Sequence, residues 1–417
     1  MWRAIKISDI SDYFEIAGRK GAVLLDTSNF RMRSYPILSC IRDSLNKIKS
    51  GSVELGYDDP SGSCTLRELI AIHESYYEGI ELSSSNVVVN SGGVTGSFSN
   101  VFQYISKSNR KSSKNEVIIP TPSYGAISRG VLYEGLRPVF VPTSFKYRFQ
   151  SRSEDIKSKI SDRTLGIFLT SPGNPCCSYL DNEELKKIIN LAQEIDSFVV
   201  LDAIFEEASL NFQKQRFFSI SDYRKLIKIT GPSKDRPHMN DFRVGWSISR
   251  DIDVIKGLYL ASEVAGFSVS RSIDEIMKSE MSLRICKDRY DREGKVPDKN
   301  YPTFIRYTKE VKSFFKKIRE GLNIALDLCQ GYTVVDKIYV PEVGNLLFLK
   351  VGKHHLKSKG VYNDDSLSKY VFDKVGITIT PGHFFMANPN EIWFRVTMAM
   401  DPEEFRVHLK NVLDCLK

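Results

Sequence analysis

The chain has 417 residues, of which 41% are hydrophobic and 26% charged, so it can bury a large core in two or three structural units. The net charge is +8, but the basic stretch 107–114 lacks aromatic residues for stacking. The basic stretch 312–319 has the spacing of an amphipathic helix, so no nucleic-acid partner is expected. No run of about eighteen apolar residues and no signal-like start occurs, which predicts a cytoplasmic chain without membrane contact. None of the seven cysteines has metal-binding spacing, so no structural metal is expected.

Strand-like and helix-like segments alternate through most of the chain, which predicts an α/β architecture. We expect residues 1–50 to form an N-terminal arm and a helix of a small domain, and residues 51–285 to form a large domain. Residues 286–308 are polar and contain two prolines, so they are expected to be a connecting loop, and residues 309–417 a smaller C-terminal domain.

A glycine-rich turn follows the first strongly β-branched run of the large domain. Gly92, Gly93 and Val94 come after the predicted strand 87–89 and directly before a helix-like segment. The first amide groups of a helix have no partner within the helix and bind phosphate well. The pattern therefore predicts a phosphate site at this turn.

Polar residues end three predicted buried strands farther along the chain. Asn174 follows the apolar run 165–169, Asp202 closes the run 198–201, and Lys234 follows the run 226–229. In open α/β sheets, ligands bind at the edge where such strands end. We therefore expect these side chains to meet in one site. Between the first two lies a predicted helix that begins after Asp181, with Glu184 three residues later.

The segment around Lys234 has the residues that Schiff-base chemistry beneath a phosphate requires. Desolvation at a strand end favours the neutral amine, which can attack an aldehyde. Ser233 precedes the lysine and Arg243 follows nine residues later, and a guanidinium can hold a phosphate through two hydrogen bonds. In the C-terminal part, Arg395 is a charged residue inside the apolar strand 392–397.

In this order, these motifs resemble those of the class I and II aminotransferases, fold type I enzymes that use pyridoxal 5'-phosphate, from about Asp26 to the C-terminus. The resemblance implies a large mixed-sheet α/β domain with a smaller α+β domain, an amino acid substrate, and a homodimer with shared active sites.

The resemblance also implies roles for individual residues. Lys234 would form the Schiff base with the cofactor and later move the substrate proton, and Asp202 would keep the cofactor's ring nitrogen protonated. Asn174 would donate to the cofactor's phenolate oxygen, and Tyr124 would stack on its ring. Phe205 would lie beside the ring of the cofactor.

Other residues would hold the two charged ends of the ligands. Arg395 would bind the substrate α-carboxylate as a bidentate pair, with Asn174 beside it. Tyr57 resembles the tyrosine that reaches the phosphate of the neighbouring subunit. The remaining phosphate contacts would come from Gly92, Gly93, Val94, Ser233 and Arg243.

Several positions depart from the family pattern, all around the reacting atoms. The tyrosine expected three residues after Asp202 is Phe205, which removes one hydrogen bond to the cofactor. The departures leave three outcomes open: transamination; an atypical cyclisation, elimination or O₂-dependent oxidation or hydroxylation, with an arginine-like substrate among the options; or a non-catalytic binding subunit of this fold.

Overall fold

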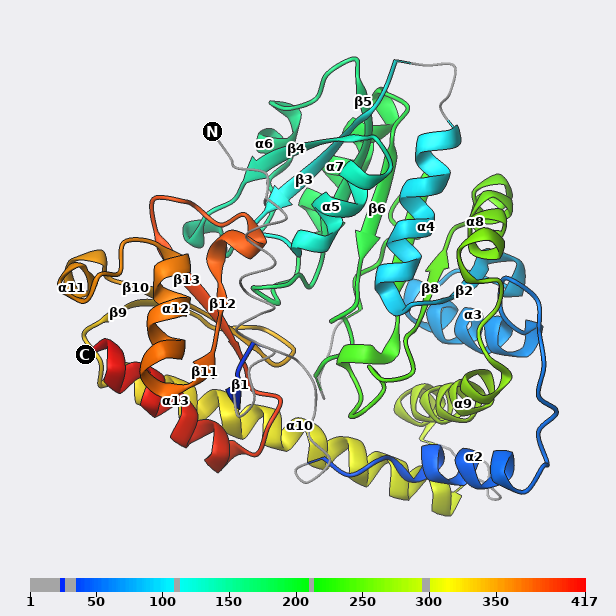
Figure 1. Ribbon diagram of the computed structural model, residues 1–417. Helices are drawn as coiled ribbons and strands as arrows, with labels where there is room; N and C mark the ends of the chain where they lie inside the picture. Colours follow the sequence, from blue (N-terminus) through cyan, green and yellow to red (C-terminus); the bar gives the residue numbers. More distant parts are fainter. Residues whose placement is uncertain (1–22, 27–34, 109–112, 210–213, 295–300) are drawn as a thin grey trace.

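A computed structural model describes residues 23–26, 35–108, 113–209, 214–294 and 301–417. Its largest element is a seven-stranded sheet in the order β2-β8-β7-β6-β5-β3-β4, shown in Figure 1. Only β8 runs antiparallel to its neighbours. The strands are β2 (Val87–Ser91), β3 (Glu116–Thr121), β4 (Arg137–Pro142), β5 (Thr164–Thr170), β6 (Phe198–Asp202), β7 (Leu226–Thr230) and β8 (Val244–Ile248).

Helices cover both faces of this sheet because successive side chains of its buried strands point to opposite sides. Val199 and Leu201 face one core, which also contains residues of α3 (Cys64–Glu78), α7 (Asn182–Glu194) and α9 (Arg271–Glu293). Val200 faces the other core, with residues of α4 (Gly93–Ser108), α5 (Gly125–Tyr133) and α8 (Ile252–Gly266). The short helix α6 (Ser153–Lys157) packs against α7.

The predicted start of the helix between β5 and β6 is confirmed. The carboxylate of Asp181 accepts hydrogen bonds from the backbone N–H groups of Glu183 and Glu184, which have no partner within α7. The side chain of Glu184 accepts from the backbone N–H of Ser153, so it ties α6 to the start of α7.

A second, antiparallel sheet of four strands has the order β12-β13-β10-β9 and its own core. Its strands are β9 (Val335–Tyr339), β10 (Leu346–Val351), β12 (Thr380–Pro381) and β13 (Ile392–Thr397). The helices of this part are α11 (Lys353–Leu356), α12 (Asp364–Val375) and α13 (Pro402–Leu416). Strand β1 (Val23–Leu24) pairs with β11 (Ile377–Thr378), so the first described residues lie in this C-terminal part.

Two expectations about the domain connections were wrong. Within the predicted loop 286–308, α9 continues to Glu293 and α10 (Tyr301–Gln330) has already begun, with Pro302 in its first turn, where a missing N–H is tolerated. Helix α10 runs along the lower edge of the molecule in Figure 1 and contacts both α9 and α13. Helix α2 (Ser39–Lys49) buries Cys40 and Ile41 in the core that it shares with α9, not in the C-terminal core.

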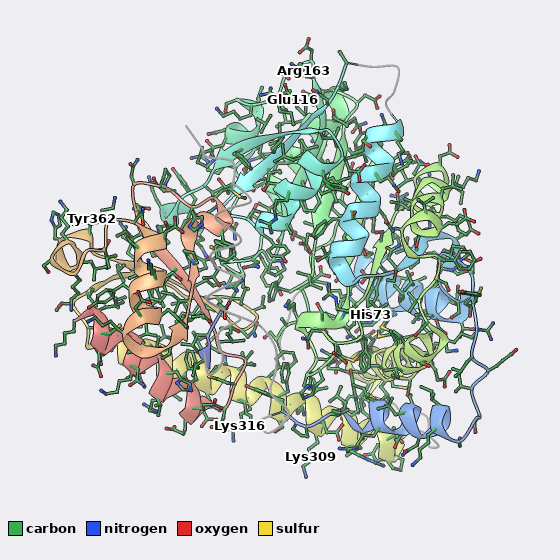
Figure 2. All side chains as sticks on the ribbon, in the orientation of Figure 1. His73, Glu116, Arg163, Lys309, Lys316 and Tyr362 are labelled. Carbon is green, nitrogen blue, oxygen red and sulfur yellow. The ribbon has the colours of Figure 1, made fainter. Side chains whose placement is uncertain are left out.

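Among the described residues, none of the helices has an apolar stretch long enough to cross a membrane. The basic side chains of α10 lie on its outer surface, where Figure 2 labels Lys309 and Lys316.

Candidate active site

A cavity of about 250 Å³ lies where β3, β5, β6 and β7 end, and it reaches the C-terminal sheet. The structure therefore brings together side chains from segments far apart in the sequence, as the strand-end pattern predicted. The residues that line the cavity are Val94, Thr95, Phe98, Tyr124, Asn174, Asp202, Ile204, Phe205, Ser233, Lys234, Arg243 and Arg395.

Lys234 ends the single 3-10 turn Pro232–Lys234 that follows β7. Burial, followed by the nearby cations Arg395 and Arg243, lowers the pKa of Lys234 to about 8. An ordinary lysine is almost entirely protonated at neutral pH, whereas this one has a substantial neutral fraction. Lys234 therefore has the protonation behaviour of a nucleophilic amine.

Asp202 is the last residue of β6 and only 4% exposed. Burial raises the pKa of Asp202 to about 7, against the opposing hydrogen bond of 3.1 Å from the backbone N–H of Ile204. A cation beside such a buried carboxylate lowers its pKa, so that the carboxylate is fully charged at neutral pH. The position suits a ligand with a positively charged ring nitrogen.

Arg395 of β13 connects the C-terminal sheet to the loop after β5. Its Nη1 donates to Asn174 Oδ1 at 3.0 Å, and its Nη2 donates to Thr380 Oγ1 at 3.1 Å and to the backbone carbonyl of Asp26. The guanidinium also lies 5.1 Å from the ring centre of Phe385. Its Nε is buried and has no hydrogen-bond partner among the described residues, so it retains a donor for a ligand.

The glycine turn differs from its prediction in one respect. The backbone N–H of Gly93 donates to the carbonyl of Arg243 at 2.7 Å, so this amide already has an acceptor. The Arg243 guanidinium donates in turn to the carbonyl of Gly92 at 2.7 Å. Only Val94 of the three predicted residues lines the cavity. A side chain at Gly245 would bring its first carbon within 2.7 Å of the Gly93 and Val94 backbone, so this close approach requires glycine.

The other predicted residues occupy distinct places. Tyr124 precedes α5 and is 37% exposed, and Ser233 is buried beside Lys234. Phe205 is 1% exposed and packs in a small cluster that contains Cys177. Tyr57 lies outside the cavity lining, is 83% exposed, and contacts Phe267 edge-to-face with ring centres 5.5 Å apart.

Three cavity residues were not predicted: Thr95, Phe98 and Ile204. Thr95 stands in the first turn of α4, directly after the glycine turn, so its place could have been inferred from that motif. Phe98 and Ile204 are apolar and give no chemical signal that separates them from core residues.

These residues fit pyridoxal 5'-phosphate. Lys234 offers an amine with a lowered pKa. Among the residues that the structure describes, no cation pairs with the buried carboxylate of Asp202, and no acceptor binds Arg395 Nε. The first turn of α4 and Arg243 supply a positive region for a phosphate.

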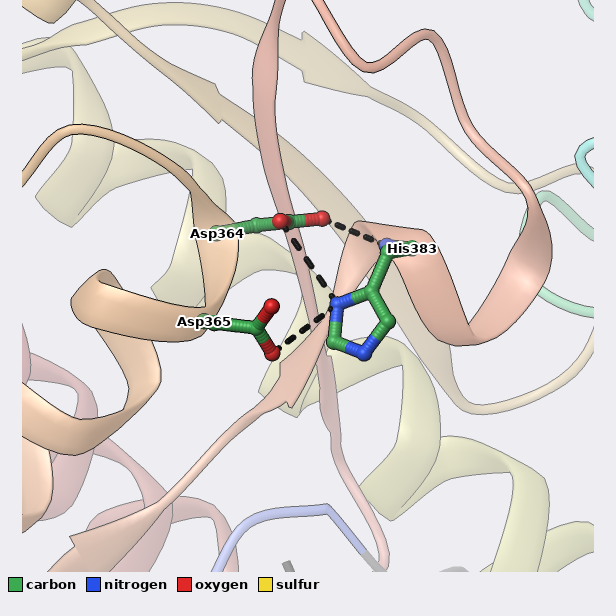
Figure 3. Close-up of side chains that lie close together, drawn as sticks. All are labelled: Asp364, Asp365 and His383. Carbon is green, nitrogen blue, oxygen red and sulfur yellow. Dashed lines mark hydrogen bonds and ion pairs between the residues drawn. The ribbon is translucent and has the colours of Figure 1, made fainter. Parts of the chain in front are cut away.

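A separate group of ionisable side chains lies at the start of α12, outside this cavity (Figure 3). His383 Nδ1 is 3.5 Å from Asp364 Oδ1 and 3.2 Å from Asp365 Oδ1, and the backbone N–H of His383 donates to Asp364. One nitrogen or oxygen atom of each of the three side chains could bind a metal ion, and these three atoms lie within 4.8 Å of one another. Asp364 and Asp365 stand in the first turn of α12, where acidic side chains stabilise a helix. Their pairing with His383 accounts for the position of the imidazole beside them.

Comparisons with known proteins identify the family of the chain. The family model Aminotransferase class I and II matches residues 21–412, so the chain belongs to that family. It is 24% identical to a probable aspartate/prephenate aminotransferase of Aquifex aeolicus, over 91% of this chain and 86% of that protein. It is also 24% identical to an aspartate aminotransferase of Sulfolobus acidocaldarius, over 88% of this chain and 84% of that protein.

Solved structures show the same fold. An aspartate aminotransferase of Thermus thermophilus with maleate superposes with a TM-score of 0.77 at 18% identity, covering 99% of this chain and 96% of that one. An aromatic aminotransferase of Pyrococcus horikoshii gives a TM-score of 0.75 at 18% identity, covering 97% and 98%. The predicted fold type I architecture is confirmed.

Family membership confirms the predicted enzyme class and cofactor. Members of the family use pyridoxal phosphate, and the chain is a pyridoxal-phosphate-dependent aminotransferase. The names of these relatives do not favour cyclisation, elimination or oxidation, nor a non-catalytic subunit.

Proposed function

We propose that Lys234 is the catalytic lysine of this aminotransferase and that Arg395 binds the α-carboxylate of its amino acid substrate. The observation that carries the proposal is the meeting of Lys234, Asp202, Asn174 and Arg395 in one cavity. Of these, Lys234 has a pKa near 8, so a neutral amine is available where the reaction needs it.

The cofactor, when bound, supplies an aldehyde for an amine and a ring that accepts the electrons released when a substrate Cα–H bond breaks. Asp202 would hold a proton at the ring nitrogen and keep the positive charge there. Asn174 would orient the ring through its amide group. Val94, Ser233 and Arg243 would bind the phosphate.

Lys234 has two tasks in this proposal. Its Nζ would hold the cofactor covalently until the substrate amine takes its place. The freed Nζ would then take the proton from the substrate Cα and give it to the C4′ carbon of the cofactor, on the other side of the shared nitrogen, so a single amine would serve as base and then as acid. The apolar walls Phe98, Ile204 and Phe205 limit the access of water to this proton.

We propose an α-amino acid as the substrate. Arg395 is the cavity cation that supports this choice, because its Nε has no protein partner among the described residues and its Nη1 already orients Asn174. The relatives are named for aspartate, prephenate and aromatic substrates, and these are the first compounds to test here.

We also propose a homodimer in the cytoplasm. Tyr57 is 83% exposed and contacts Phe267, which is 40% exposed, and Val264 of α8, three residues before Phe267, is 78% exposed. Such a cluster of exposed apolar side chains suits a second copy of the chain. All seven cysteines are free thiols, which supports a reducing compartment.

The experiment is to load the purified protein with pyridoxal phosphate, reduce it with borohydride and map the labelled peptide. We expect the label on Lys234, and on no peptide in the Lys234→Ala variant. A second sample receives aspartate, phenylalanine or arginine, and we expect at least one to convert the bound cofactor to its amine form with release of the keto acid. A label on another lysine, or an unlabelled protein after loading, would overturn the proposal.

A further inference from the structure

A cluster of buried charges adjoins the segments that carry Asp202 and Lys234. It is built from α3, β7, α9, the segment after β6 and the segment after Lys234. Figure 2 labels His73, one member, in the interior of the molecule. The buried-charge cluster consists of side chains that are each 8% exposed or less: His73, Glu74, Glu206, Glu207, Lys214, Lys228, Asp235, Arg236, Glu280, Arg284 and Asp288.

Arg284 of α9 hydrogen-bonds to three carboxylates of this cluster. Its Nε donates to both carboxylate oxygens of Glu280, at 2.8 and 2.7 Å. Its Nη1 donates to Glu207 Oε2 at 2.9 Å and to Asp235 Oδ2 at 2.7 Å, and its Nη2 donates to Asp235 Oδ1 at 3.3 Å. The Arg284 side chain is 2% exposed, so its guanidinium holds these three carboxylates in the interior.

Two of these carboxylates belong to the segments that carry the active-site residues. Asp235 directly follows Lys234, and Glu207 lies two residues after Phe205 and five after Asp202. The strands β6 and β7 pair up to Asp202 and Ile229, and the backbone N–H of Ala203 adds one more hydrogen bond, to the carbonyl of Ile229 at 2.8 Å. Beyond Ala203 and Thr230, which are joined by a hydrogen bond from Thr230 Oγ1 to the Ala203 carbonyl at 3.3 Å, Arg284 binds both Glu207 and Asp235, and Arg236 Nη2 lies 3.9 Å from Glu207 Oε2.

Stability alone does not explain such a cluster. Replacing buried ion pairs with well-packed apolar side chains often leaves stability unchanged or raises it, because removing charges from water is costly. What a guanidinium provides is direction, since its planar fork fixes each bound carboxylate at a set angle and distance. An arginine that bridges two segments therefore sets their relative position.

We propose that Arg284 is a positioning residue: by binding Asp235 and Glu207 together, it holds the segment of Lys234 at a fixed place relative to the segment of Asp202 and Phe205. The inference rests on the proposed role of Lys234. Arg284 itself does not line the cavity, so it acts through the residues that it holds.

The test compares the parent with Arg284→Lys, which keeps the positive charge but lacks the fork that serves three carboxylates. Leu409→Ala is the matched control, because Leu409 is fully buried in the C-terminal core and its loss lowers stability far from the cavity. The main measurement is the rate at which the apoprotein gains visible absorbance after pyridoxal phosphate is added, as a function of pH. This rate reports the neutral fraction of Lys234 without any turnover.

For the parent, the capture rate should rise with pH through a midpoint near the pKa of Lys234, about 8. For Arg284→Lys, we expect the midpoint to move up by about half a unit or more, since a displaced Lys234 is better hydrated and farther from Arg395 and Arg243. We also expect kcat to fall about tenfold while KM changes less than about threefold. Leu409→Ala should keep the parent midpoint and kcat.

An unchanged midpoint and kcat in Arg284→Lys would overturn the inference, whatever its thermal stability. If that variant does not fold, Asp235→Asn removes one of the bridged carboxylates and is judged by the same midpoint and kcat. If the parent protein captures no cofactor at Lys234, the proposed function is overturned as well. If the parent captures the cofactor and Arg284→Lys behaves like the parent, only the role of Arg284 is overturned.

Discussion

Two lysines six residues apart show how their surroundings decide what a buried amine can do. Lys228, within β7, has its Nζ 2.8 Å from Glu206 Oε2 and 2.9 Å from Glu74 Oε2. Although burial opposes the charge, these carboxylates raise the pKa of Lys228 above its usual value. For Lys234, just beyond the same strand, burial is joined by the nearby cations Arg395 and Arg243 instead, and its pKa falls to about 8.

This difference in pKa distinguishes a structural lysine from a reactive one. A paired, permanently charged lysine holds carboxylates in place, whereas a lysine without a carboxylate partner and near other cations can lose its proton and attack. Both regions contain buried ionisable groups, but in the buried-charge cluster the cations have carboxylate partners. The cavity, by contrast, holds cations and one buried carboxylate, Asp202, which forms no ion pair with any residue that the structure describes. We therefore expect substitutions in the two regions to fail in different ways.

The largest expected effect is on turnover in Lys234→Ala. Loss of the base should lower kcat by about a hundredfold to ten-thousandfold. The cofactor should still bind without a covalent bond, because Val94, Ser233 and Arg243 remain. Steady-state kinetics and equilibrium dialysis measure the two quantities. Turnover close to that of the parent would contradict the assignment of Lys234.

Lys228→Met should instead act on stability. Removing one partner of a buried ion pair leaves uncompensated charges, so the free energy of unfolding should fall by about 3–5 kcal/mol. Borohydride should still fix the cofactor on Lys234. The double variant Lys228→Met/Glu206→Gln removes the opposing charge too, so its loss should be smaller. Chemical denaturation of all three proteins checks the order, and a single variant as stable as the double would contradict it.

Arg395→Lys tests the substrate end of the cavity. A lysine cannot form the bidentate pair with a carboxylate, and a hydrogen bond to a charged group contributes roughly 1.5–3 kcal/mol, so kcat/KM should fall about tenfold to a hundredfold. The matched control uses the amine that corresponds to the substrate without its carboxylate. This amine should react slowly, and at the same rate in parent and variant. If kcat/KM falls equally for the amine and for the amino acid, Arg395 has a purely structural role.

The sequence predicted the components of the site better than their contacts. Lys234, Asp202 and Asn174 could be placed at one sheet edge because each follows a buried apolar run, and strands that run in parallel end together. The hydrogen bond between Arg395 and Asn174 joins residues 221 positions apart, and no local pattern encodes it. The backbone N–H of Gly93 binds the carbonyl of Arg243, a residue 150 positions later, and only the folded structure brings the two together.

The buried-charge cluster and the start of α10 escaped the sequence analysis for related reasons. His73, Glu280 and Arg284 look like ordinary solvated helix residues until α3 and α9 are packed together. The segment at Pro302 looked like a loop because it is polar and contains proline. Its polarity belongs to the exposed face of α10, and the proline stands in the first turn, where it does not break a helix.

The smallest expected effect concerns Phe205, which packs against the cluster of Cys177 and also lines the cavity. Phe205→Tyr adds an O–H where the family resemblance implies a donor to the cofactor's phenolate oxygen. This donor would compete with the proton that the oxygen shares with the Lys234 nitrogen, so the proton should leave at lower pH. A hydrogen bond of roughly 1.5 kcal/mol shifts such a midpoint by about one unit.

The midpoint is read from the visible absorbance of the loaded protein as the pH changes. Phe205→Leu is the matched control, because it alters the packing without adding a donor. We expect the midpoint to fall in Phe205→Tyr and to stay within about 0.3 units of the parent in Phe205→Leu, since only a polar group changes the balance of the shared proton. Equal midpoints in all three proteins would mean that Phe205 serves only to pack the wall of the cavity. Asn174 would then be the side chain that sets the protonation of the bound cofactor.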